Sequence, residues 1–124
     1  MTAAPDRTQI VYKILDADAW ATAEREGVFR GAGIDLQDGF IHFSTAGQAR
    51  ETAAKHFAGR ENLVIVAFDG ERLDALHGGA YRYEPSRGGD LFPHLYGEAT
   101  METVVSVRPL PLGPDGNHAF PPLP

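Results

Sequence analysis

Apolar positions alternate or run together in four short segments, which predicts a fold that contains β-strands. Residues 9–15 alternate between two faces and carry Lys13 in their middle, as expected of a first strand. Residues 63–68 (Leu-Val-Ile-Val-Ala-Phe) are apolar throughout, which is typical of a central strand covered on both faces. Residues 80–84 and 103–108 are weaker strand candidates.

Helical spacing predicts two helices between the first strand and the central one. Asp16 can cap a helix over residues 17–26, which a glycine then ends. Thr45 stands three residues before Gln48, the spacing of a capping box, so a second helix is expected from Thr45 to about residue 56. Apolar residues recur at helical intervals in both segments.

A short strand is expected over residues 40–44, just before the second helix. Phe40, His42 and Ser44 would share one face of it. At Thr45 the free N–H groups and the positive end of the helix dipole meet, so a phosphate or carboxylate could bind there with His42 as a donor. The alternative is that Ser44 or Thr45 only caps the helix and that His42 is a half-buried core residue.

Length and composition fit one domain over residues 1–124, with a core at about 9–121, a short N-terminal tail and a proline-rich C-terminal tail. The chain has no cysteine, which excludes disulfides and thiolate metal sites. Its net charge of −6 opposes broad binding to nucleic acid. We expect a cytoplasmic protein without a membrane partner, because the sequence shows no signal peptide and no apolar run of about 20 residues.

A second candidate site is the loop predicted over residues 85–97. It combines a fixed cation with rings that suit stacking on a base. These residues are Arg87, Phe92, His94 and Tyr96. The alternative is that Gly88 and Gly89 only turn a hairpin and that the aromatic rings only fill the core. Arg87 would then pair with Glu84 or Asp90.

Other kinds of site find little support in the residue spacing. A metal site would have to gather His42 and His94 with His77 or His118, and no motif joins them. A hydrolase of the serine or cysteine type lacks its nucleophile motif, and the glycine-rich loops of Rossmann and P-loop proteins are missing.

Two long motifs resemble a bacterial family, domain-of-unknown-function family 952. They are residues 38–45 (Asp-Gly-Phe-Ile-His-Phe-Ser-Thr) and residues 86–97 (Ser-Arg-Gly-Gly-Asp-Leu-Phe-Pro-His-Leu-Tyr-Gly). Shorter similar features are residues 11–14, Trp20 and residues 51–54. The resemblance covers about residues 9–121. That family has no established activity, so the resemblance by itself implies no reaction.

The family is in turn similar to the ADP-ribosyltransferase superfamily, and most of all to its RNA 2′-phosphotransferase branch. This similarity implies an α+β fold with a small split β-sheet core and two main helices. It places His42 on the second histidine of the superfamily pattern, and Ser44 and Thr45 on the hydroxyl pair beside it. Lys13 falls where the first histidine of the pattern stands, and a lysine side chain differs from a histidine in its length and its charge.

The resemblance also implies a small phosphorylated or nucleotide ligand, with NAD as the candidate cofactor. Catalytic roles would fall to His42, Arg87 and Glu84. Arg82 is the alternative to Arg87. Further ligand contacts are expected from Lys13, Ser44, Thr45, Phe92, His94 and Tyr96. The implied reaction is transfer of ADP-ribose or NAD-dependent transfer of phosphate. The rival hypotheses are a ligand-binding module without catalysis, which Lys13 favours, and a structural or protein-interaction domain.

Overall fold

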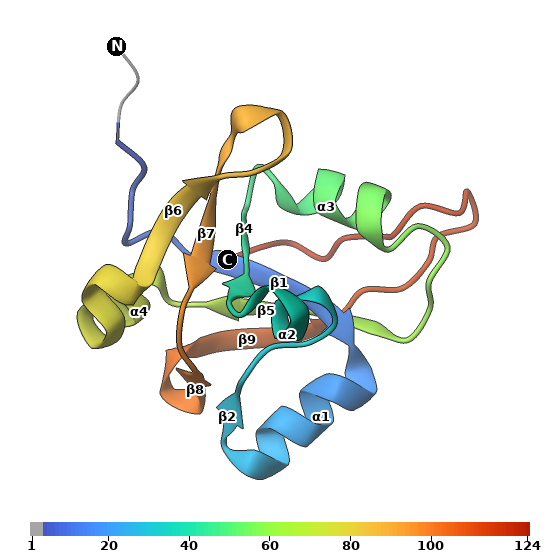
Figure 1. The fold of residues 1–124 in the computed structure, drawn as a ribbon. Helices are drawn as coiled ribbons and strands as arrows, with labels where there is room; N and C mark the ends of the chain where they lie inside the picture. The colour runs from blue at the N-terminus through green and yellow to red at the C-terminus, as the bar shows by residue number, and fades with distance from the viewer. Residues whose placement is uncertain (1–3) are drawn as a thin grey trace.

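The structure is a computed structural model that describes residues 4–124, apart from the side chain of Arg87. In that part of the chain, four helices and nine short strands form a mixed α and β fold (Figure 1). The helices are α1 (Ala17–Glu26), α2 (Ile34–Asp38), α3 (Ala49–His56) and α4 (Gly70–His77). Single 3₁₀ turns follow at Gly78–Ala80, Arg87–Gly89 and Met101–Thr103.

The strands form three small antiparallel sheets. The largest has the order β4-β1-β5-β9, from Ser44–Thr45, Val11–Asp16, Leu63–Phe68 and Val104–Pro109. The second has the order β3-β7-β6, from Ile41–His42, Leu91–Leu95 and Tyr81–Pro85. The third pairs β2 (Val28–Phe29) with β8 (Ala99–Thr100). The expected split sheet core is therefore present as several separate sheets.

The core has two parts, one on each face of the largest sheet. On one face, Trp20 of α1 packs against Phe29 and Phe68, with the Trp20 and Phe68 rings edge to face at 6.0 Å. On the other face, Ala49 and Ala53 of α3 belong to a cluster that includes Tyr12, Ile14 and Leu110. Burial of both faces explains why β5 is apolar at successive positions.

The predicted first helix and central strand are confirmed at residues 17–26 and 63–68. Gly27 ends α1 in the left-handed conformation, at φ 77°, and its N–H bonds back to the last helical turn. The strands expected near residues 80–84 and 103–108 are also present, each displaced by one residue. The described tail after Leu110 has no helix or strand; it contains an isolated bridge between Leu112 and His118 and a turn between these two residues.

Two predictions are wrong here, and two helices were missed. The second helix begins at Ala49, not at Thr45, because only half of the capping box forms: the Thr45 N–H donates to Gln48 Oε1 at 3.0 Å. The loop expected over residues 85–97 contains β7, which pairs with β6 as a hairpin. Helices α2 and α4 were not predicted at all. Asp69 caps α4 by accepting the N–H groups of Glu71 and Arg72.

None of the helices described here is long and apolar enough to cross a membrane.

Candidate functional site: two histidines on one cavity

The segment 38–45 passes from one sheet to another, which is why its single predicted strand is observed as two. Its first part, β3, pairs with β7, so that His42 lies opposite His94. Its second part, β4, pairs with β1, so that Ser44 lies opposite Tyr12. Between the two parts, the Phe43 N–H donates to Pro93 O at 2.9 Å. The crossing brings the two long sequence motifs together.

Asp35 is the centre of a buried polar cluster beside His42. Its side chain is fully buried, and its carboxylate accepts from Lys13 Nζ at 2.7 Å, from the Ala32 N–H and from both the N–H and the ring Nδ1 of His42. Burial opposes ionisation of Asp35, but the His42 hydrogen bond and the Lys13 charge outweigh it and lower its pKa. The carboxylate is therefore charged at neutral pH. The sequence reasoning missed this residue.

Lys13 is held by that cluster and is not turned outward as a free cation. Its ammonium lies 2.9 Å from Asp35 Oδ1 and 2.9 Å from the backbone oxygen of His42. Burial lowers the pKa of Lys13, while the Asp35 carboxylate opposes that change. Lys13 therefore connects β1 to α2 and to β3, which carries His42, a role that sequence reasoning did not anticipate for it.

His42 has a carboxylate at each ring nitrogen. Nδ1 lies 2.6 Å from Asp35 Oδ1, and Nε2 lies 3.0 Å from Asp38 Oδ2. Both contacts can be hydrogen bonds at once only when the ring carries both protons, because a carboxylate accepts and does not donate. In this arrangement His42 is a fixed, carboxylate-bound ring.

His94 has one carboxylate partner. Its Nδ1 lies 2.8 Å from Glu84 Oε1, and the Tyr96 hydroxyl donates to the same oxygen at 2.7 Å. Burial lowers the pKa of His94 and the nearby His42 adds to this, although Glu84 acts in the opposite direction. At neutral pH the ring is therefore mostly uncharged. With Nδ1–H donating to Glu84, the lone pair of His94 is on Nε2.

Phe40 packs against both histidines. Its ring centroid lies 4.4 Å from that of His42, 4.4 Å from that of His94 and 4.8 Å from that of Tyr96. The two imidazole rings are 5.2 Å apart, edge to face. Arg82 stacks over the outer ring of this group, Tyr96, at 4.5 Å. The aromatic residues of both motifs thus form one cluster.

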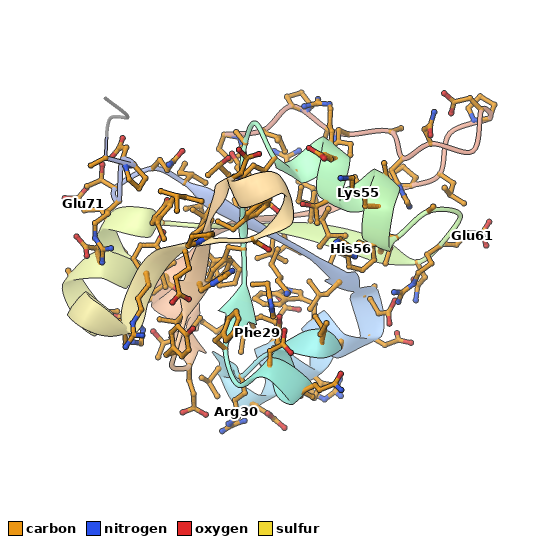
Figure 2. All side chains as sticks on the ribbon, turned by 45° about the horizontal axis from the view of Figure 1, so that its top comes forward. Phe29, Arg30, Lys55, His56, Glu61 and Glu71 are labelled. Atoms are coloured by element: carbon orange, nitrogen blue, oxygen red, sulfur yellow. The ribbon has the colours of Figure 1, made fainter. Side chains whose placement is uncertain are left out.

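A cavity of about 540 Å³ lies beside this cluster, between β1, α3 and the β6–β7 hairpin. That volume is within the range of about 300–1,000 Å³ typical of small-molecule sites. Its walls include polar and aromatic side chains: Tyr12, Lys13, Asp38, His42, Phe43, Ser44, Thr52, His56, Phe57, Arg60, Ser86, Phe92 and His94. Figure 2 shows His56 on the side of α3 that faces the body of the domain, below Lys55. A smaller cavity of about 320 Å³, between α3 and the C-terminal segment, contains none of the predicted site residues.

The cavity brings together five of the predicted site residues, namely Lys13, His42, Ser44, Phe92 and His94. Glu84 stands behind His94 and Tyr96 lies on the outer side of Phe40, so neither lines the cavity wall. Ser44 bonds to the Thr52 hydroxyl at 2.8 Å. The side chain of Arg87 lies outside the described part of the structure.

The predicted anion site at the start of the second helix does not open into this cavity. Thr45 pairs with Val11 on β1, and the helix begins only at Ala49. Thr45 and the turn that follows it, residues 46–48, are absent from the cavity lining. The physical reason is that β4 joins the edge of the largest sheet, which directs the turn away from His42.

The histidines considered for a metal site are not gathered. His42 and His94 are neighbours, but His118 bonds to Arg60 O at 2.9 Å and His77 packs near Gly97. Among the residues that the structure describes, no group of three or more potential ligands is placed to hold a metal ion.

Together, fold and site define a small mixed α and β domain with a histidine-lined cavity. Residues 14–107 match the family described as "Protein of unknown function (DUF952)", and the chain belongs to that family. Its relatives of known structure include protein CC0527 from Caulobacter crescentus. The crystal structure of CC0527 is 43% identical in sequence, with a TM-score of 0.82 over 90% of this chain and 94% of that one. The solution structure of the same protein gives 44% identity and a TM-score of 0.75 over 87% and 90%. No curated protein matches the sequence.

Proposed function

We propose that this chain binds a small organic ligand in the 540 Å³ cavity and that His94 is the group that accepts a proton or hydrogen bond from it. The observation that carries this proposal is the Glu84–His94 pair. A carboxylate at Nδ1 orients the ring and fixes its tautomer, as in histidine–carboxylate pairs that act in general acid–base catalysis. The lowered pKa of His94 keeps Nε2 unprotonated at neutral pH.

Asp35 and His42 support that site from the other side. His42 packs on Phe40, which in turn packs on His94, and Asp35 holds His42 through both the backbone and the ring. Because both nitrogens of His42 face carboxylates, we assign His42 to positioning and to ligand contact rather than to proton transfer.

Transfer of ADP-ribose from NAD, which the sequence resemblance implied, is the first reaction to test within this proposal. It is supported by the placement of His42 and Ser44 on the cavity wall and by Glu84 next to His94. A ligand-binding module without catalysis is the second candidate. It is favoured by Lys13, which is engaged by Asp35 at the position where the superfamily pattern has its first histidine.

The test is ligand-induced thermal stabilisation with NAD, ADP-ribose and a 2′-phosphorylated oligonucleotide, followed by assays for nicotinamide release and phosphate transfer. Ser86 is exposed at the cavity wall, so Ser86→Trp should obstruct the cavity without disturbing the core. Val105→Trp, on the exposed face of β9, is the matched control. We expect stabilisation in the wild type and in the control but not in Ser86→Trp. Equal stabilisation in all three proteins would place binding outside the cavity and contradict the proposal.

A further inference from the structure

The charges around the cavity limit what kind of ligand group it can hold. Lys13 lies 2.7 Å from Asp35, and Arg60 lies 2.7 Å from Asp16. His42 faces two carboxylates. Lys13 and Arg60 therefore each have an acidic partner, and a phosphate placed beside either of them would meet negative charge as well as positive. Electrostatic attraction for a phosphate inside the cavity is correspondingly weak.

His94 adds a hydrogen-bond acceptor to the cavity wall. Nδ1 of His94 is occupied by Glu84, and within the described chain no side chain or backbone group bonds to Nε2. A neutral imidazole with Nδ1–H presents a lone pair at Nε2, which accepts an N–H or O–H from a ligand and repels another acceptor. An acceptor-rich anion such as phosphate is the poorest match for it.

Four aromatic rings also stand on the wall. Tyr12, Phe43, Phe57 and Phe92 line the cavity together with aliphatic parts of β1. Aromatic walls favour flat, apolar ligand faces through stacking and edge-to-face contacts. The aromatic side chains of the wall, the acceptor on His94 and the paired cations thus favour the same kind of ligand group.

We propose that the cavity holds the flat, uncharged heteroaromatic ring of its ligand, with a ring N–H, amine or hydroxyl donating to His94 Nε2, and that any phosphate stays outside. This proposal rests on the function proposed above and specifies its ligand class. Nucleobases belong to that class. A phosphate on such a ligand would lie outside the cavity, near Ser86, which is exposed at the cavity wall.

Binding should depend on pH through His94, because the protonated ring has no lone pair to offer. The groups that act on His94 come from three elements: Glu84 of β6, His42 of β3 and Asp35 of α2. Arg82 lies opposite His94 in the β6–β7 register. The lowered pKa keeps His94 unprotonated at pH 7.5, so acidification below the ordinary histidine range should weaken binding.

The experiment compares adenosine, guanosine, cytidine and uridine with their 5′-monophosphates and with inorganic phosphate, by chemical-shift titration at pH 7.5 and at acid pH. We expect at least one nucleoside to bind. Its monophosphate should bind with an affinity within about threefold of that of the nucleoside, a difference of under about 0.7 kcal/mol in binding free energy. Inorganic phosphate should not compete with the nucleoside. For a bound adenosine, N6,N6-dimethyladenosine removes the donor and should bind at least about tenfold more weakly.

His94→Phe keeps the ring and removes the acceptor, and it should weaken nucleoside binding at least about tenfold while a thermal melt confirms that the protein is folded. His77→Gln, outside the cavity lining, is the control and should bind as the wild type does. Monophosphates that bind more than tenfold tighter than nucleosides, or competition by inorganic phosphate, would overturn the ring proposal and leave the ligand-binding function standing. If no compound binds here and none stabilises the protein in the panel above, both proposals fail.

Discussion

His42 and His94 stand opposite each other on neighbouring strands, yet their surroundings differ. His42 lies between the carboxylates of Asp35 and Asp38, and Asp35 is fully buried and paired with a buried lysine. His94 has a single carboxylate partner, Glu84, which is partly exposed and also holds Tyr96. The first arrangement fixes a charged network in the interior. The second arrangement orients the ring of His94, and the Nε2 atom of that ring can accept a hydrogen bond from a ligand.

The comparison separates residues that stabilise the fold from residues that act on a ligand, within one site. Buried, multiply bonded charges are costly to disturb, whereas a partly exposed pair contributes little to stability. Breaking the His42 cluster should therefore cost more stability than breaking the His94 pair, and the His94 pair should matter more for ligand chemistry. Four changes test this division.

The largest effect is expected from Asp35→Asn. It leaves the buried Lys13 ammonium without its counter-ion, which should lower the free energy of unfolding by about 3–5 kcal/mol. Urea unfolding followed by circular dichroism measures the change. The double variant Lys13→Met/Asp35→Leu removes both charges and should recover part of the loss. Equal losses in the single and double variants would show that pairing is not the cause.

Phe40→Ala should have the next largest effect, because this ring packs on both histidines and on Tyr96. A fully buried phenylalanine costs about 3–5 kcal/mol on truncation, and the half-buried Phe40 should cost about 1–3 kcal/mol. Phe40→Leu, which keeps apolar bulk, is the matched control and should lose less. A negligible loss in Phe40→Ala would mean that the two histidine environments are not coupled through this ring.

The pH dependence of stability should show a contribution from His94. Its pKa is lowered in the folded protein, so as the pH falls below the unfolded value of about 6.5 the unfolded chain takes up the proton first and stability decreases. The slope from this one group is at most about 1.4 kcal/mol per pH unit. Chemical unfolding between pH 7.5 and pH 5 should give a shallower slope for His94→Gln than for the wild type. An unchanged slope would contradict the assigned shift.

Glu84→Gln should have the smallest effect on stability, under about 1 kcal/mol, because the Glu84–His94 pair is partly exposed. Its effect on His94 should nevertheless be clear. Removing the carboxylate removes the contribution that raises the pKa of His94, so this pKa should fall further below its value in the wild type. A histidine NMR titration of both proteins measures the difference, and a rise in the variant would be inconsistent with the pair as described.

The sequence was informative where local pattern decides the structure. Helix 17–26 and the strand at 63–68 follow from their own residues. The break of residues 40–44 into two strands could not be predicted in this way, because it depends on pairing with β7 and β1, which are distant in the sequence.

Asp35 illustrates what local pattern does not contain. It lies in a five-residue helix between Gly33 and Gly39, both at positive φ, and so short an element has no helical periodicity to read. Its burial is compensated by Lys13, which lies 22 positions earlier on a strand. The useful sequence signal was Lys13 itself, a charged residue within an otherwise apolar strand, which required an acidic partner somewhere in the fold.

The most direct test of the account is the protonation and tautomer of His94 in the free protein at neutral pH, measured by long-range ¹H–¹⁵N NMR of the imidazole nitrogens. The account predicts a neutral ring with the proton on Nδ1, facing Glu84, and an unprotonated Nε2. A ring that is protonated at both nitrogens at pH 7, or one with the proton on Nε2, would contradict it.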